Sequence, residues 1–165
     1  MTRPVAVPVR LPHPALPRAD WADRYEIEVA GPLTAMQAAE LAISHQPSWV
    51  RGLMWLRNRI VSMFGIKTSE HVRARAGRKI GFFPLVAATD SQVVLGFDDR
   101  HLDFRVVVDI RDNGAKAQTV TMTSLIKRNV AFGYVYLAAV TPFHRLIVQS
   151  MLAHLASARP LPDGR

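Results

Sequence analysis

The sequence lacks several features that would place it in a familiar class. It contains no cysteine, which excludes a disulfide framework, a thiolate zinc site and a cysteine nucleophile. Glycine-rich phosphate motifs and metal-type histidine spacings are also absent, so we predict neither a cofactor nor a metal site. The longest uncharged apolar run, residues 130–143, is shorter than the ~20 residues of a membrane-spanning helix. Prolines interrupt the N-terminal residues that a secretory signal would need, and we expect a cytoplasmic protein.

Acidic residues are scarce in one part of the chain. The 165 residues carry a net charge of +8, and residues 51–80 contain eight basic side chains against one acid, Glu70. Such a segment attracts anions: a carboxylated or phosphorylated ligand, an anionic membrane surface or nucleic acid. A solvated basic loop accounts equally well for this composition. We do not expect nucleic acid, because no reader motif is present and the nearby aromatic residues are spaced for packing within a helix.

The apolar pattern predicts one domain preceded by a proline-rich arm. Residues 1–19 form the extended arm, residues 20–158 the domain, and residues 159–165 a short polar tail. Within the domain, the pattern predicts a strand over residues 25–29. Helices are predicted over residues 34–45 and 47–65, and a basic loop follows them.

A change to a period of two predicts four further strands after this loop. They cover residues 81–88, 92–97, 102–112 and 118–127, and Asn113-Gly114 is typical of a hairpin turn between the last two. In the third strand, alternate residues from Leu102 to Ile110 are apolar and the residues between them are charged, except Val107. This alternation predicts an antiparallel sheet with one covered face.

The last part of the chain is predicted to be helical. Residues 132–140 form an apolar helical segment, and Thr141-Pro142 has the composition of a cap and first residue of a final helix. That helix carries an apolar stripe made of Phe143, Leu146, Ile147, Met151, Leu152 and Leu155. A curved antiparallel sheet wrapped around this helix would bury both apolar faces. We therefore predict an α+β fold of the helix-grip type seen in START-like proteins.

Arg57 is the most informative residue of the predicted helix over residues 47–65. It falls inside the apolar arc of that helix, where an unpaired guanidinium is too costly to bury. It is therefore either an anion-binding arginine in a pocket or one partner of a structural ion pair with a carboxylate of the sheet.

A dense group of ionisable residues surrounds the start of the strand at residues 102–112. Asp99, His101, Asp103 and Arg105 alternate onto one side, which permits a carboxylate–imidazole–carboxylate row suited to acid–base chemistry. Charged residues on the outward face of a strand are also typical of cross-strand ion pairs in water. Both interpretations stay open.

His144 is a further candidate because it lies near the start of the predicted final helix. There it faces either the mouth of a cavity or the solvent. Ser124 and Thr123 lack the strand–turn–helix context of a nucleophile elbow, so we predict no hydrolase triad.

Three segments together resemble a bacterial family described only as a domain of unknown function. They read WVR followed by LRNRIV (residues 49–51 and 56–61), LGFDDRHLDFR (95–105), and YLA followed by PFHRLIV (136–138 and 142–148). The resemblance implies a START-like helix-grip fold, in a domain found alone or appended to short-chain-dehydrogenase-like NAD(P)-binding domains. An NAD(P)-dependent oxidoreductase is therefore a possible partner. The resemblance gives weight to Arg57, Asn58, Asp99, Arg100, His101, Asp103, Arg105, Phe143 and His144.

Our leading functional hypothesis is a domain that binds a small amphipathic or anionic molecule between the sheet and the C-terminal helix. Arg57, with Asp99 or His101 near the rim, would hold the polar end of the ligand. The apolar walls would come from Phe104, Val106, Tyr134, Phe143, Ile147 and Met151.

Two alternatives belong to other functional classes. One is a polyketide-cyclase-type enzyme in which His101, beside Asp99, or His144 is the general base. This alternative depends on analogy of fold alone. The other is a peripheral-membrane or protein-interaction module that uses Trp55 and Arg59.

Overall fold

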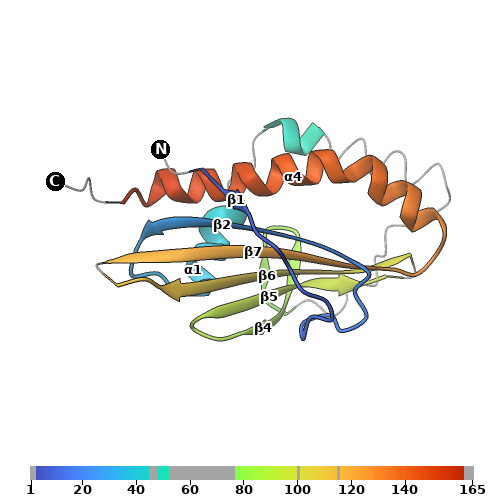
Figure 1. Ribbon diagram of the computed structural model, residues 1–165, viewed down its shortest axis with the longest axis horizontal. Helices are drawn as coiled ribbons and strands as arrows, with labels where there is room; N and C mark the ends of the chain where they lie inside the picture. The colour runs from blue at the N-terminus through green and yellow to red at the C-terminus, as the bar shows by residue number, and fades with distance from the viewer. Residues whose placement is uncertain (1–2, 45–47, 53–76, 100, 115, 162–165) are drawn as a thin grey trace.

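The computed structural model describes residues 3–44, 48–52, 77–99, 101–114 and 116–161 (Figure 1). Its seven strands form one sheet in the order β1-β2-β7-β6-β5-β4-β3, with antiparallel neighbours throughout. In chain order the elements are β1 (Val5–Ala6), β2 (Trp21–Ala30), α1 (Ala35–Ser44), β3 (Lys79–Ile80), β4 (Phe83–Ala88), β5 (Gln92–Asp98), β6 (Leu102–Asp112), β7 (Ala117–Arg128) and α4 (Phe132–Ala158).

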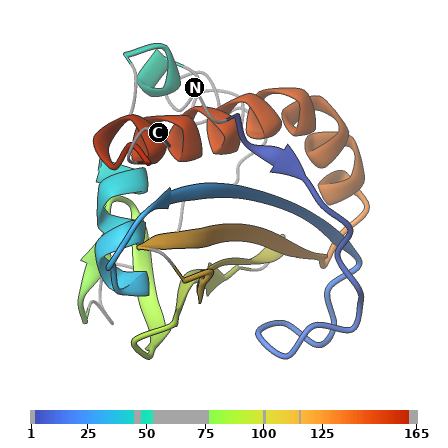
Figure 2. The ribbon, with the colours of Figure 1, turned by 60° about the vertical axis from the view of Figure 1, so that its left-hand side comes forward.

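Helices cover one face of this sheet, which we call the inner face. α4 runs across it, and α1 contacts α4, β5 and β6 at one end (Figures 1 and 2). The core between these layers contains apolar side chains of α1, α4 and four central strands, among them Ile27, Val29, Ala39, Ile43, Leu95, Val108, Met122, Leu152 and Leu155. The predicted mixture of an antiparallel sheet and a C-terminal helix is confirmed.

The strand predictions are accurate in the middle of the sheet and less accurate toward its edges. β6 has the predicted bounds, and β5 and β7 extend the predicted strands by one or two residues. β2 is longer than the predicted strand because Trp21–Ala30 pairs along its whole length with β7. Near the other edge, the strand predicted over residues 81–88 begins two residues too early, because Gly81 adopts a left-handed φ of 58° in the turn between β3 and β4.

The N-terminal arm packs on the outer face of the sheet. β1 pairs with β2, and the arm then passes to the side of the sheet opposite α4 (Figure 2). There Leu16 packs with Val94, Val107 and Leu125, forming a second, smaller core. This contact explains the exception in the alternation of β6: Val107 points outward with its charged neighbours, yet it is fully buried.

A turn within the arm holds Leu16 in place. The backbone N–H of Leu16 donates to the carbonyl oxygen of His13 (3.0 Å), and the N–H of Ala15 donates to Nδ1 of the same residue (3.2 Å). Burial lowers the pKa of His13 below its ordinary value, which favours the neutral ring that accepts this bond.

The helix predicted over residues 34–45 is α1. Thr34 precedes it and forms a capping box: its Oγ1 accepts the N–H of Gln37, and Oε1 of Gln37 accepts the N–H of Thr34. Residues 48–52 are helical, as predicted for the start of the next helix, and lie on the outer side of α4 (Figure 2). The rest of that prediction falls outside the described residues.

The predicted break at Thr141-Pro142 is wrong. α4 is one helix of 27 residues with Pro142 inside it, and no described helix is long and apolar enough to cross a membrane. Proline has no N–H to bond to the carbonyl oxygen of Ala138, and such positions bend helices. The hydroxyl of Thr141 donates to the carbonyl oxygen of Leu137 (2.6 Å) just before this point. Figure 2 shows α4 bending toward its N-terminal end.

The buried face of α4 also differs from the predicted stripe. Phe143 and Leu146 are 47% and 57% exposed, because the continuous helix contacts the core along a different line from the predicted stripe. The buried apolar residues of the helix are Leu137, Val148, Met151, Leu152 and Leu155.

The contact of the arm with the sheet makes a testable prediction about stability. Leu16→Ala should lower the free energy of unfolding by about 2–4 kcal/mol, because a buried leucine loses its packing against three apolar side chains. Urea denaturation measures this difference. Leu11→Ala is the matched control in the same arm, since Leu11 is 41% exposed, and should change stability by less than ~0.5 kcal/mol. Equal effects of the two variants would show that the arm does not contribute to the folded core.

Candidate functional site

A buried polar group interrupts the apolar contact between α4 and the sheet. His144 lies on α4 with its Nε2 3.2 Å from Oδ1 of Asp23 on β2 and 3.0 Å from Oγ of Ser124 on β7. We call Asp23, Ser124 and His144 the His144 cluster. The side chains of His144 and Asp23 are only 17% and 12% exposed, and Ser124 is fully buried.

The register of the sheet brings the two strand residues of the cluster together. Asp23 and Ser124 are direct partners in the β2–β7 ladder. Asp23 has the same parity as Tyr25 and Ile27, so its side chain projects onto the inner face, where α4 lies. On α4, His144 falls between the buried residues Leu137 and Val148, at spacings of about two turns and one turn.

The carboxylate beside Nε2 favours one tautomer of the His144 ring. An ionised carboxylate only accepts hydrogen bonds, so Nε2 of His144 carries the hydrogen that is shared between Asp23 and Ser124. In the neutral ring, Nδ1 then holds the free lone pair, and no hydrogen bond joins it to a described residue. The second carboxylate oxygen of Asp23, Oδ2, is buried and has no partner among the described residues.

This geometry differs from a hydrolase triad. In such a triad, the carboxylate and the hydroxyl contact opposite nitrogens of the imidazole, which can then take the hydroxyl proton. Here both contact Nε2, and a nitrogen that donates to Asp23 does not accept a proton from Ser124. The ring of Trp21 meets that of His144 edge-on, with centroids 5.7 Å apart, and fixes the orientation of the imidazole.

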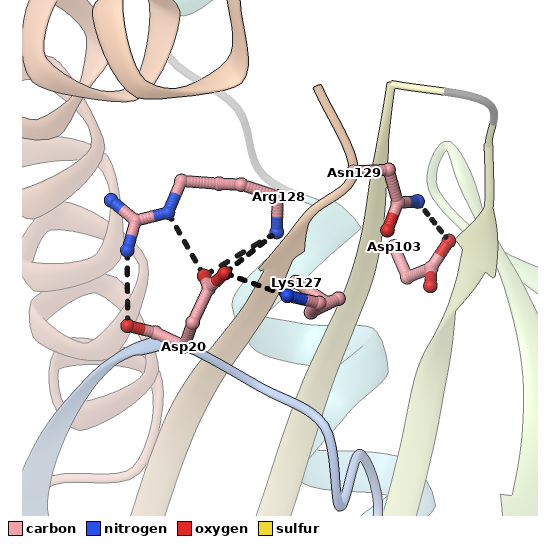
Figure 3. Close-up of polar contacts among 5 residues, drawn as sticks. All are labelled: Asp20, Asp103, Lys127, Arg128 and Asn129. Carbon is pink, nitrogen blue, oxygen red and sulfur yellow. Dashed lines mark hydrogen bonds and ion pairs between the residues drawn. The ribbon is translucent and has the colours of Figure 1, made fainter. Parts of the chain in front are cut away.

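A second polar group, the Asp20 cluster, consists of Asp20, just before β2, and Lys127 and Arg128 at the end of β7 (Figure 3). Asp20 accepts hydrogen bonds from Nζ of Lys127 (3.1 Å) and Nε of Arg128 (2.9 Å), while Nη2 of Arg128 donates to its carbonyl oxygen. Burial acts to raise the pKa of Asp20, but these bonds outweigh it and hold the pKa below its ordinary value. The guanidinium of Arg128 also lies 3.9 Å from the centroid of the Tyr134 ring.

A family model described as "Protein of unknown function (DUF2867)" matches residues 15–151. This range spans most of the chain and contains both polar clusters. The chain belongs to the DUF2867 family. Membership of an uncharacterised family is thereby confirmed, whereas the START-like relationship and the bacterial origin stay predictions. No curated protein and no solved structure matches the chain.

The residues predicted near the β5–β6 turn of this DUF2867 domain lie together, but they make structural contacts. The side-chain amide of Asn129 donates to the carbonyl oxygen of Asp99 (3.0 Å) and to Oδ1 of Asp103 (3.1 Å; Figure 3). The backbone N–H of Asn129 donates to the carbonyl oxygen of His101 (2.9 Å). Asn129 thus joins the end of β7 to the predicted carboxylate–imidazole–carboxylate row.

Arg105 lies on the outer face, away from the His144 cluster. Its guanidinium pairs with Asp98 (2.7 Å) and donates to the carbonyl oxygens of Phe97 and Phe104, so it binds the strand ends together. Gly96 makes this possible: it has a φ of 150°, and a Cβ there would collide with the carbonyl oxygen of Phe104.

The remaining predicted residues of the DUF2867 domain are exposed or lie outside the described range. Tyr134 is 53% exposed and Phe143 47% exposed, whereas Phe104, Val106, Ile147 and Met151 belong to the core or pack against it. Arg57, Asn58 and Arg100 are not among the described residues, and neither is most of the basic segment over residues 51–80. The expected anionic membrane surface or ligand for that segment stays a prediction.

Sequence reasoning missed Asp23, Ser124 and Trp21. A signal for Asp23 was available: it continues the alternation of Tyr25, Ile27 and Val29, and a carboxylate at a core-facing position of a strand is unusual. The predicted strand began at Tyr25, two residues too late to include it. Ser124 gave a weaker signal, since the residues on both faces of β7 are buried.

An open groove lies at the other end of α4. It has a volume of about 540 Å³ and is lined by Pro32, Leu33, Gln37, Glu40, Leu41, Ser44, His154 and Arg159. The described residues contain no group of three or more histidine and acidic side chains that could hold a metal ion. The His144 cluster is therefore the candidate site with defined polar geometry.

The Asp20 cluster predicts a pH-dependent contribution to stability. A carboxylate with a lowered pKa stabilises the fold above about pH 4, and this stabilisation is lost as the pH falls through the lowered pKa. Asp20→Asn should therefore lower the free energy of unfolding by about 1.5–3 kcal/mol at pH 7, with a difference that shrinks toward pH 2.

Urea denaturation of wild type and variant across this pH range measures the effect. Asp90→Asn, at an exposed position, serves as the control with the same change in charge. A deficit of Asp20→Asn that persists unchanged at pH 2 would contradict the assignment of the stabilisation to the carboxylate.

Proposed function

We propose that this DUF2867 domain is a START-like, helix-grip domain that binds a small amphipathic molecule between the inner face of the sheet and α4. The strand order supports the fold assignment, because β7 pairs with β2 and the chain then returns across the inner face as α4. The ligand's polar end would contact the His144 cluster, and its apolar body would lie against side chains of the core.

One observation carries this proposal: three polar side chains occupy positions where an apolar core would be more stable. Burying a carboxylate and an imidazole costs free energy that their mutual contact offsets only in part. The cost is higher here because Oδ2 of Asp23 has no partner among the described residues. The partial exposure of Asp23 and His144 supports access from the solvent.

A general-base enzyme is the second candidate, and the Asp23–His144 contact favours it. A carboxylate that holds Nε2 of an imidazole leaves Nδ1 as the proton acceptor, which is the arrangement of a histidine base with a positioning carboxylate. In this candidate His144 is the base, whereas His101 makes a backbone contact at the β5–β6 turn.

The proposed function predicts that one triple variant loses ligand binding but keeps its free energy of unfolding. Asp23→Val, Ser124→Ala and His144→Leu together remove every partner of the cluster, so no unpaired polar group remains, and the free energy of unfolding should be unchanged or higher. Native mass spectrometry of protein purified from cells, followed by organic extraction, should find an amphiphile bound to wild type and lost from the triple variant.

Thr123→Val is the matched control on the outer face of β7. It removes a buried hydroxyl that also has no partner among the described residues, so it should raise stability and leave the bound amphiphile in place. A triple variant that is strongly destabilised would assign the cluster a structural role. Wild type that binds no amphiphile, either after purification or when one is added, would overturn the proposed function.

A further inference from the structure

The hydrogen-bonding groups of the His144 cluster that remain without a partner are mostly acceptors. The single hydrogen on Nε2 is used within the cluster, between Asp23 and Ser124. Two acceptors then remain, Oδ2 of Asp23, which is buried, and Nδ1 of the neutral His144 ring, together with one donor, the hydroxyl of Ser124. A ligand group that only accepts hydrogen bonds would leave both acceptors unsatisfied, whereas a group that donates hydrogen bonds would satisfy at least one.

The charged group in direct contact with His144 is the carboxylate of Asp23, which disfavours an anion at this position. The two cations that follow it on β7, Lys127 and Arg128, are bound by Asp20. Arg24 has the opposite parity to Asp23 and therefore lies on the outer face of the sheet. The carboxylate of Asp23 thus has no described cation beside it except His144 when that ring is protonated.

We propose that the His144 cluster selects ligands whose polar end donates hydrogen bonds, an alcohol or an ammonium group, and rejects carboxylates. This inference deepens the proposed function and depends on it. It also opposes what the composition alone suggests, since a net charge of +8 attracts anions. The donor replaces the partner that Oδ2 of Asp23 lacks, and the apolar chain of the ligand takes the place of solvent beside Trp21.

The test compares three ligands with the same alkyl chain: dodecanol, dodecylammonium and dodecanoate. Isothermal titration calorimetry below their micelle concentrations should show that dodecanol or dodecylammonium binds about tenfold or more tightly than dodecanoate, because an acceptor facing a buried acceptor leaves both unpaired. Equal binding of the two favoured ligands would assign the selectivity to hydrogen bonding. Stronger binding of dodecylammonium would assign part of it to charge.

Asp23→Asn replaces a hydrogen-bond acceptor of the His144 cluster by a donor, with little change in the shape of the side chain. The amide places a donor where Oδ2 was, so the preference over dodecanoate should fall severalfold or reverse. Asp109→Asn is the matched control: it makes the same change in net charge on the outer face of β6 and should leave the preference unchanged. Urea denaturation verifies that both variants are folded. The order of the three ligand affinities is measured on wild type, so this part of the test does not depend on a variant.

The possible failures are distinguishable. Tightest binding of dodecanoate to wild type, or equal preferences in Asp23→Asn and Asp109→Asn, would overturn this inference and leave the proposed function standing. Binding of none of the three ligands would overturn both, because the proposed function requires an amphiphile in this site.

Discussion

The pairing of β2 with β7 is the constraint on which the rest of the structure depends. It joins the first long strand to the last one, with Trp21–Ala30 opposite Ala117–Ile126. A shift of this register by one residue would move every side chain of one strand to the opposite face. Asp23 and Ser124 would then no longer face each other beneath α4, and the apolar residues of β2 would leave the core.

The Asp20 cluster explains how this register is held at one end. Asp20 directly precedes β2 and binds Lys127 and Arg128, the last two residues of β7, so it marks the end of the ladder with three charged groups. At the other end of the ladder, apolar packing of the strands against α1 and α4 holds the register. The His144 cluster lies between a charged clamp and an apolar core, where small changes of polarity have large energetic consequences.

The sequence predicted the sheet better than the site, for identifiable reasons. The strand at residues 102–112 alternates so regularly that its bounds were correct, and its one irregularity, Val107, pointed to a second packing surface. The sequence could not predict that Leu16 packs on Val107, because a single leucine in a proline-rich arm has no periodicity. His144 was named as a candidate, but its partner Asp23 lies more than a hundred residues away, and only the register brings them together.

The bend at Pro142 divides α4 into an N-terminal and a C-terminal segment. The longer C-terminal segment is anchored to the sheet by Val148, Leu152 and Leu155, whereas the N-terminal segment holds through Leu137. His144 lies two residues beyond the proline, next to the point where the helix has one hydrogen bond fewer. A displacement of His144 therefore acts next to the turn of α4 that lacks one backbone hydrogen bond.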